Sequence, residues 1–136
     1  MLDGDRVLLV KRGHAPLNGE WSLPGGAVHV GETLEDAIAR EILEETCLEV
    51  EVGPVIAVLN RISHDAGGRV EYHYVLIDYL CRPTGGTLRC ASDAAAAEWA
   101  GLDDFDRYGL ADLARAVIRK AASLPWPPRQ VHGHAK

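Results

Sequence analysis

The sequence of 136 residues has no long hydrophobic run, few cysteines and a shortage of positive charge. Without an apolar stretch of membrane-spanning length, it predicts no transmembrane helix and no membrane partner. The three cysteines, Cys47, Cys81 and Cys90, form no closely spaced pairs, which favours free thiols over a disulfide framework or a zinc site. With 14 Lys and Arg against 20 Asp and Glu, the net charge of −6 argues against nucleic acid as the main partner.

A secretory signal is also missing from the start of the chain. The charged residues Asp3, Asp5 and Arg6 interrupt any apolar segment there, so we expect a cytoplasmic protein. The length suits one domain with a real core. We expect that domain to span residues 1–123 and residues 124–136, with three prolines, to form a tail.

What the sequence does contain is a helix rich in glutamate. Thr33 followed by Asp36 is typical of a helix start. The positions that would form its buried stripe recur at helical spacing and are Leu34, Ala37, Ile38 and Ile42.

Three carboxylates, those of Glu41, Glu44 and Glu45, fall in the C-terminal half of this helix. The helix macrodipole disfavours each of them there by roughly 0.3–1 kcal/mol. One interpretation is the charged outer face of an ordinary amphipathic helix. The other is a site for a divalent cation, because carboxylate oxygens suit Mg²⁺.

The residues around the helix resemble the Nudix box, G-x5-E-x7-R-E-U-x-E-E-x-G-U with U aliphatic. Gly26, Glu32, Arg40-Glu41, Ile42, Glu44-Glu45 and Leu48 match it, and only the last glycine differs, because Cys47 stands there. Glycine at such a position ordinarily adopts a left-handed conformation that ends the helix. The substitution therefore concerns helix stability and removes no carboxylate.

This resemblance implies an α/β fold, a Nudix-type α/β/α sandwich with a mixed sheet between the box helix and a C-terminal helix. It implies Mg²⁺, with Mn²⁺ as a substitute, held by Glu41, Glu44, Glu45 and the carbonyl of Gly25. We expect Arg40 to orient Glu41 or Glu44 through a charge-assisted hydrogen bond, and Glu32 to brace the loop.

The general base stays open among Glu41, Glu44 and Asp93. Some Nudix enzymes have an acidic residue five positions before a late Glu-Trp pair, and Asp93 has this spacing from Glu98-Trp99. The alternative is that Asp93 caps an alanine-rich turn.

The rest of the chain predicts strands and one further helix. We expect strands over residues 6–11, 49–60 with a break at Gly53-Pro54, 70–81 and 87–89, then a loop over 90–104 and a helix over 110–123. We place Leu113, Val117, Ile118 and Ala121 on the buried side of that helix. The strand that precedes residue 6 in Nudix proteins is expected to be short or missing, which leaves a sheet edge uncovered and favours a homodimer.

The resemblance implies an enzyme that hydrolyses a pyrophosphate bond in a nucleoside diphosphate linked to another moiety. We rank ADP-ribose or a nucleotide sugar first, a (deoxy)nucleoside triphosphate second and a dinucleoside polyphosphate third. A hypothesis from another class is a Nudix-like domain that binds a nucleotide without cleaving it. Such domains commonly lose box glutamates, whereas this sequence keeps all of them.

Overall fold

A computed structural model describes residues 1–13, 19–89, 91 and 94–126 of the chain. Six strands and three helices follow one another: β1 (Leu2–Asp3), β2 (Arg6–Arg12), β3 (Trp21–Ser22), α1 (Leu34–Thr46), β4 (Leu48–His64), β5 (Val70–Gly86), β6 (Ala94–Gly101), α2 (Phe105–Tyr108) and α3 (Asp112–Ser123). Asp93 and residues 127–136 lie outside the described part. None of the described helices has the length and hydropathy to cross a membrane.

The strands form two sheets. β2 pairs with β1, β3 and β6 in one sheet, and β4 pairs with β5 in the other. All of the described pairings are antiparallel, whereas we expected a single mixed sheet. β1 has two residues, which pair with Arg6 and Val7 of β2.

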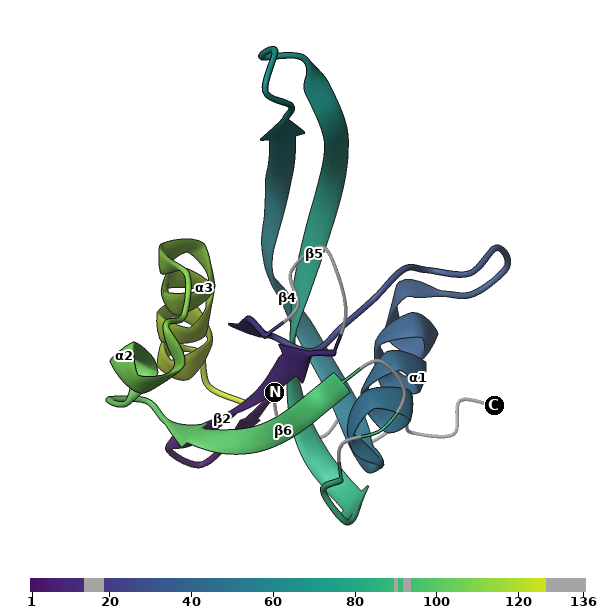
Figure 1. The fold of residues 1–136 in the computed structure, drawn as a ribbon. Helices are drawn as coiled ribbons and strands as arrows, with labels where there is room; N and C mark the ends of the chain where they lie inside the picture. The colour runs from purple at the N-terminus through teal and green to yellow at the C-terminus, as the bar shows by residue number, and fades with distance from the viewer. Residues whose placement is uncertain (14–18, 90, 92–93, 127–136) are drawn as a thin grey trace.

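The helices cover opposite sides of these sheets, as Figure 1 shows. Neighbouring residues of β2 point to opposite faces, as strand geometry requires. Leu8 packs with Ile42 of α1, whereas Leu9 packs with Ile118 of α3, and both leucines are fully buried. The predicted α/β/α sandwich is therefore confirmed.

The box helix begins and ends as its sequence predicts. Thr33 is the N-cap, and its hydroxyl accepts a hydrogen bond of 3.1 Å from the backbone N–H of Asp36. Cys47 ends the helix in the left-handed region, with φ of 62°. Its N–H donates to the carbonyl of Leu43 at 2.9 Å.

Three local predictions were wrong. β5 continues through Pro83 and the two glycines after it, because these residues still lie opposite β4. Residues 87–89 form no strand, and residues 94–101, expected in a loop, form β6. Alanine has little tendency to form strands, but pairing along the whole of β2 overrides this local preference.

Two smaller expectations also differ. Leu113 of α3 is 47% exposed, although Val117, Ile118 and Ala121 are buried as predicted. The expected break at Gly53-Pro54 is a register irregularity inside one long strand.

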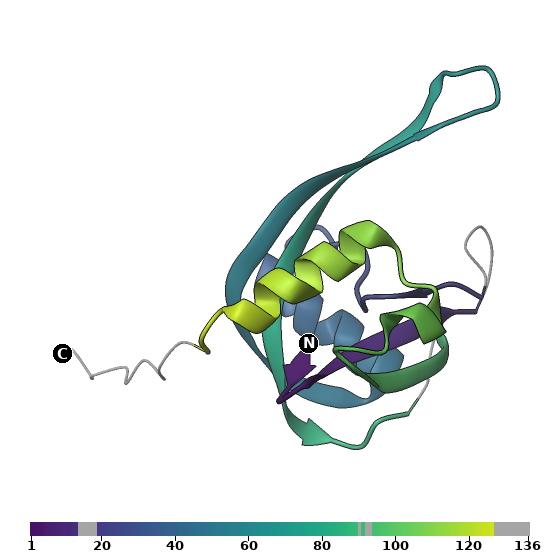
Figure 2. The same cartoon turned by 90° about the vertical axis from the view of Figure 1, so that its left-hand side faces the viewer.

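The outer parts of β4 and β5 form a two-stranded arm, which we define as residues 55–79. Its base packs against α3 through Ile56, and its outer part extends beyond the helices. Figures 1 and 2 show it rising well above the rest of the molecule. At its tip, Asp65 accepts hydrogen bonds from the N–H groups of Gly67 and Arg69 at 2.9 and 3.0 Å.

Candidate active site around the box helix

The loop before α1 folds back along the helix. It has no regular secondary structure from Leu23 to Val30, and it turns at Gly31, whose φ of 87° suits glycine. The N–H of Glu32 donates to the carbonyl of His29 at 3.0 Å. This turn brings Glu32 next to the second turn of α1.

Arg40 holds the loop and the helix together. Its guanidinium donates two hydrogen bonds to the carboxylate of Glu32, of 2.7 and 2.9 Å, in the bidentate geometry that suits this pair. It also donates to the carbonyl of Ala27 at 2.9 Å. Its remaining terminal nitrogen donates to Glu41 at 2.9 Å and to Glu44 at 3.3 Å. One arginine thus contacts three box glutamates and the backbone of the loop.

The contact with Arg40 keeps Glu32 in its ionised form. The hydrogen bonds from Arg40, followed by the one from the N–H of His29, lower the pKa of Glu32 to about 2. The same pairing raises the pKa of Arg40. Glu32 keeps 15% of its side chain exposed, so the ion pair lies at the edge of solvent. The expected bracing geometry of Glu32 is present.

Gly26 packs directly against Glu41. A Cβ atom built on Gly26 would collide with the carboxylate of Glu41, 2.6 Å from its second oxygen. No side chain larger than hydrogen fits between the loop and this carboxylate. The glycine therefore lets the loop close over Glu41, whose side chain is 16% exposed.

The three glutamates of the predicted metal site differ in their surroundings. Glu41 and Glu44 both point towards Arg40, and Glu44 is 48% exposed. In the part of the chain that the structure describes, no group of three or more His, Cys, Asp or Glu side chains is gathered closely enough to hold a metal ion. The donors themselves, carboxylate and carbonyl oxygens, are those that Mg²⁺ prefers. The metal role of Gly25, Glu41, Glu44 and Glu45 thus stays a prediction.

The segment after β5 is tied to the end of the box helix. The N–H of Arg89 donates to the carbonyl of Thr46 at 2.9 Å, and that of Ala91 donates to the carbonyl of Glu45 at 3.1 Å. Asp93 follows Ala91 by two residues but lies outside the described part, so its role also stays a prediction. Glu98, whose spacing from Asp93 suggested that residue's role, accepts a hydrogen bond from the hydroxyl of Tyr108 at 2.8 Å.

Sequence reasoning missed two contacts of this region. The Ala27 carbonyl gave no signal, because any residue type supplies a backbone oxygen. Tyr79 of β5 donates to Glu35 in the first turn of α1 at 3.3 Å, and burial raises the pKa of its phenol. The alternation of β5 assigns Tyr79 a face, but only the fold shows that α1 covers that face.

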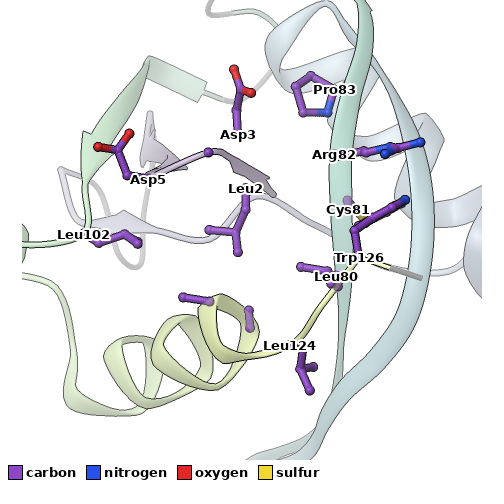
Figure 3. A pocket seen from close by; sticks show the side chains of 13 residues that line it. Leu2, Asp3, Asp5, Leu80, Cys81, Arg82, Pro83, Leu102, Leu124 and Trp126 are labelled. Atoms are coloured by element: carbon purple, nitrogen blue, oxygen red, sulfur yellow. The ribbon is translucent and has the colours of Figure 1, made fainter. Parts of the chain in front are cut away.

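A separate cavity of about 440 Å³ lies on the other side of β5 (Figure 3). It is lined by the β1–β2 turn, the inner part of β5 and the end of α3, with Leu2, Leu80 and Trp126 in its wall, and it is open to solvent. Arg82 stacks over Trp126 at 4.6 Å and pairs with Glu51 at 2.7 Å. None of the predicted site residues lines this cavity.

Comparison with known proteins gives consistent results. The NUDIX domain family matches residues 1–126. A protein of Mycobacterium tuberculosis named as a putative 8-oxo-dGTP diphosphatase 2 is 38% identical over 130 residues, covering 89% of this chain and 88% of its own length. The crystal structure of a MutT NUDIX hydrolase from Burkholderia pseudomallei superposes with a TM-score of 0.74 at 33% identity, covering 88% of this chain and 91% of that one.

An ADP-ribose pyrophosphatase of Methanocaldococcus jannaschii is 36% identical over 103 residues, which is 76% of this chain. The chain spans 59% of that relative's length and 57% of the length of a MutT-like protein from Streptomyces ambofaciens. The box, the sandwich and these matches agree: the chain belongs to the Nudix hydrolase family.

Proposed function

We propose that the protein hydrolyses a pyrophosphate bond in a nucleoside diphosphate linked to another moiety, with Mg²⁺ as cofactor. The observation that carries this proposal is the contact of Arg40 with Glu32, Glu41 and the Ala27 carbonyl. It holds a row of carboxylates beside an exposed glycine loop. A purely solvated helix face needs no such arrangement.

The proposed ligands for the metal are Glu41, Glu44, Glu45 and the carbonyl of Gly25. When bound, Mg²⁺ would neutralise charge on the bridging phosphate oxygens and acidify a water molecule. Arg40 keeps Glu41 and Glu44 in place, and Gly26 leaves room for the Glu41 carboxylate. One of Glu41, Glu44 and Asp93 takes the proton of the attacking water as the anhydride P–O bond breaks.

ADP-ribose or a nucleotide sugar is our first candidate substrate. The likeness to the M. jannaschii protein named as an ADP-ribose pyrophosphatase supports it. The second candidate is a (deoxy)nucleoside triphosphate. It is favoured by the M. tuberculosis relative, which matches over nearly its full length and is named for 8-oxo-dGTP.

A turnover screen decides between these candidates. Purified protein would be incubated with ADP-ribose, nucleotide sugars, 8-oxo-dGTP, ordinary triphosphates and dinucleoside polyphosphates, with Mg²⁺ or Mn²⁺, and products followed by chromatography. We expect cleavage of ADP-ribose or a nucleotide sugar to be fastest. Faster triphosphate cleavage would establish the second candidate. Tight binding without turnover of any compound would show a nucleotide sensor and overturn the proposal.

The metal assignment is tested by Glu45→Gln. Loss of a ligand oxygen from the chemical step should lower kcat by at least ~10²-fold. Glu35→Gln, the same change in the first turn of the same helix, is the matched control and should stay within a few fold of the wild type. Near-normal turnover of Glu45→Gln would contradict the assignment.

A further inference from the structure

Two tyrosines stand together on the arm. Tyr72 and Tyr74 lie two residues apart on β5, so they point to the same face of the strand. Their ring centroids are 4.8 Å apart, with an angle of 35° between the ring planes. Tyr72 is half-buried, whereas Tyr74 is 57% exposed. The hydroxyls of Tyr79 and Tyr108 donate to glutamates, but those of this pair have no hydrogen-bond partner among the described residues. The pair therefore presents an aromatic surface to solvent.

An arginine stands directly opposite the more exposed tyrosine. The register pairs Arg61 of β4 with Tyr74. Side chains in such a pair point to the same face, with Cβ atoms about 5 Å apart. Arg61 is exposed, and no carboxylate in the described part of the chain pairs with it. A tyrosine ring beside such a guanidinium offers a stacking surface together with hydrogen-bond donors, which is a combination that binds nucleobases.

These side chains belong to the face of the arm that α3 covers at its base (Figure 2). Leu59, two residues before Arg61, packs against a buried cluster that includes Val117 of α3. The members of this face, which we call the α3-side face, are Ala57, Leu59, Arg61 and Ser63 of β4 and Tyr72, Tyr74, Leu76 and Asp78 of β5. Its one acidic member, Asp78, lies at the base of the arm, four residues from Tyr74. The aromatic pair and the arginine lie further out.

α3 has an exposed apolar position on the side of this face. Leu113 precedes Val117 by one helical turn, so both lie on the same stripe of α3. Val117 is buried against the base of the arm, but Leu113 is 47% exposed. The stripe is thus apolar for one turn beyond the contact that buries it. A flat ligand held on the α3-side face would cover this leucine.

The same region leads into the glycine loop of the box. Leu23 packs against the same buried cluster as Leu59. Gly25 follows Leu23 by two residues, which is at most about 7 Å of chain. Arg61 lies two residues beyond Leu59, about 7 Å along the strand. A nucleotide whose phosphates lie beside Gly25 can therefore place its base on the α3-side face.

We propose that the nucleobase of the substrate stacks on Tyr74 and accepts hydrogen bonds from Arg61. This inference rests on the proposed function, because it places the far end of a nucleotide whose phosphates lie at the box. Tyr72 supports the ring of Tyr74, and Leu113 covers the base from α3. The box then binds the pyrophosphate that all candidate substrates share, and the arm distinguishes a nucleotide from a pyrophosphate without a base.

Calorimetric titration tests this without turnover. The probes are ADP, GDP and inorganic pyrophosphate, each with Mg²⁺. Tyr74→Ala should lower the affinity for the preferred nucleotide by ~10-fold and leave that for pyrophosphate within about two-fold of the wild type. Tyr74→Phe keeps the ring and should bind like the wild type. Val75→Ala is the matched control, since Val75 is 61% exposed but lies on the opposite face of the arm.

The arginine gives an independent variant. Arg61→Ala should also weaken binding of the nucleotide by ~10-fold and spare pyrophosphate. Arg69→Ala, at the tip of the arm, is its control and should bind both like the wild type. With the substrate cleaved fastest in the turnover screen, Tyr74→Ala should raise KM and leave kcat within about two-fold, because stacking is equal in the ground and transition states.

Three results overturn the inference: a Tyr74→Ala variant that binds both nucleotides like Val75→Ala, an equal loss of pyrophosphate and nucleotide affinity, or a wild type that binds neither nucleotide. Circular dichroism checks that each variant folds. If any of these results accompanies turnover in the screen, the proposed function still stands. Nucleotide binding that depends on Tyr74 in a protein without turnover would instead overturn the proposed function and leave the base site standing.

Discussion

Replacing Cys47 with glycine should stabilise the protein, although it removes a side chain. Cys47 has φ of 62° and ψ of 15°, and among the described residues it is the one non-glycine with positive φ. An L-residue in this left-handed region costs about 1–2 kcal/mol. Glycine avoids that cost but loses about 0.4–1 kcal/mol through the greater freedom of its unfolded chain. The net gain is about 0.5–1 kcal/mol, because the cap hydrogen bond from residue 47 to the Leu43 carbonyl is kept.

Urea unfolding at equilibrium measures this gain, and thermal unfolding should show a rise in Tm of about 2–5 °C. Cys47→Ala is the matched control, since it removes the thiol but keeps the Cβ that causes the strain. Cys47→Asn should fall between the two, because asparagine tolerates the left-handed region. If Cys47→Gly is no more stable than Cys47→Ala, the reasoning from backbone strain is refuted.

Three further predictions concern the box. The pKa of Glu32 is about 2, lowered chiefly by the hydrogen bonds from Arg40. The Glu32 carboxylate therefore stabilises the folded protein fully above the ordinary pKa of 4.5, and this contribution is lost as pH falls towards 2. Glu32→Gln should make the free energy of unfolding depend less steeply on pH in that window. Gly26→Ala should lower kcat by at least ~10-fold with little loss of fold, because its methyl group displaces the Glu41 carboxylate. Thr33→Ala should lower the free energy of unfolding by about 1 kcal/mol, measured in urea, by removing the N-cap.

Each of these changes has a matched control. Glu71→Gln, at an exposed position of β5, should leave the acid limb of the stability profile unchanged. Gly101→Ala should be active, since its Cβ would meet its nearest neighbour at 3.9 Å. Thr33→Ser should keep most of the N-cap stabilisation. Equal slopes for Glu32→Gln and wild type, full activity of Gly26→Ala, or no difference between the two Thr33 variants would contradict the respective arguments.

The sequence alone was most informative where the signal is local. The start of α1 at Thr33, its end at Cys47 and the row of glutamates depend on spacings within one helix and its caps. Such spacings can be recognised in a single sequence because residues three or four apart lie on the same face of a helix. The same locality explains why the family could be identified from the stretch between Gly26 and Leu48.

The errors arose where distant segments decide the structure. The alanine-rich segment forms β6 because it pairs with β2, and the low strand propensity of alanine does not predict such pairing. Pro83 and the glycines after it remained in β5 because β4 lies alongside them. A local sequence pattern cannot show that β2 pairs with β6 or that β4 pairs with the end of β5.

The sequence by itself therefore determined the family, the sandwich and which carboxylates to examine. Only the tertiary structure decided what those carboxylates contact: Arg40 reaches Glu32 and Ala27 because the glycine loop folds back over α1. It also decided that Val58, Ile62 and Val75 of the arm stay exposed. The physical reason is that hydrogen bonds and burial join residues far apart in the chain, and a spacing rule describes only residues that are close.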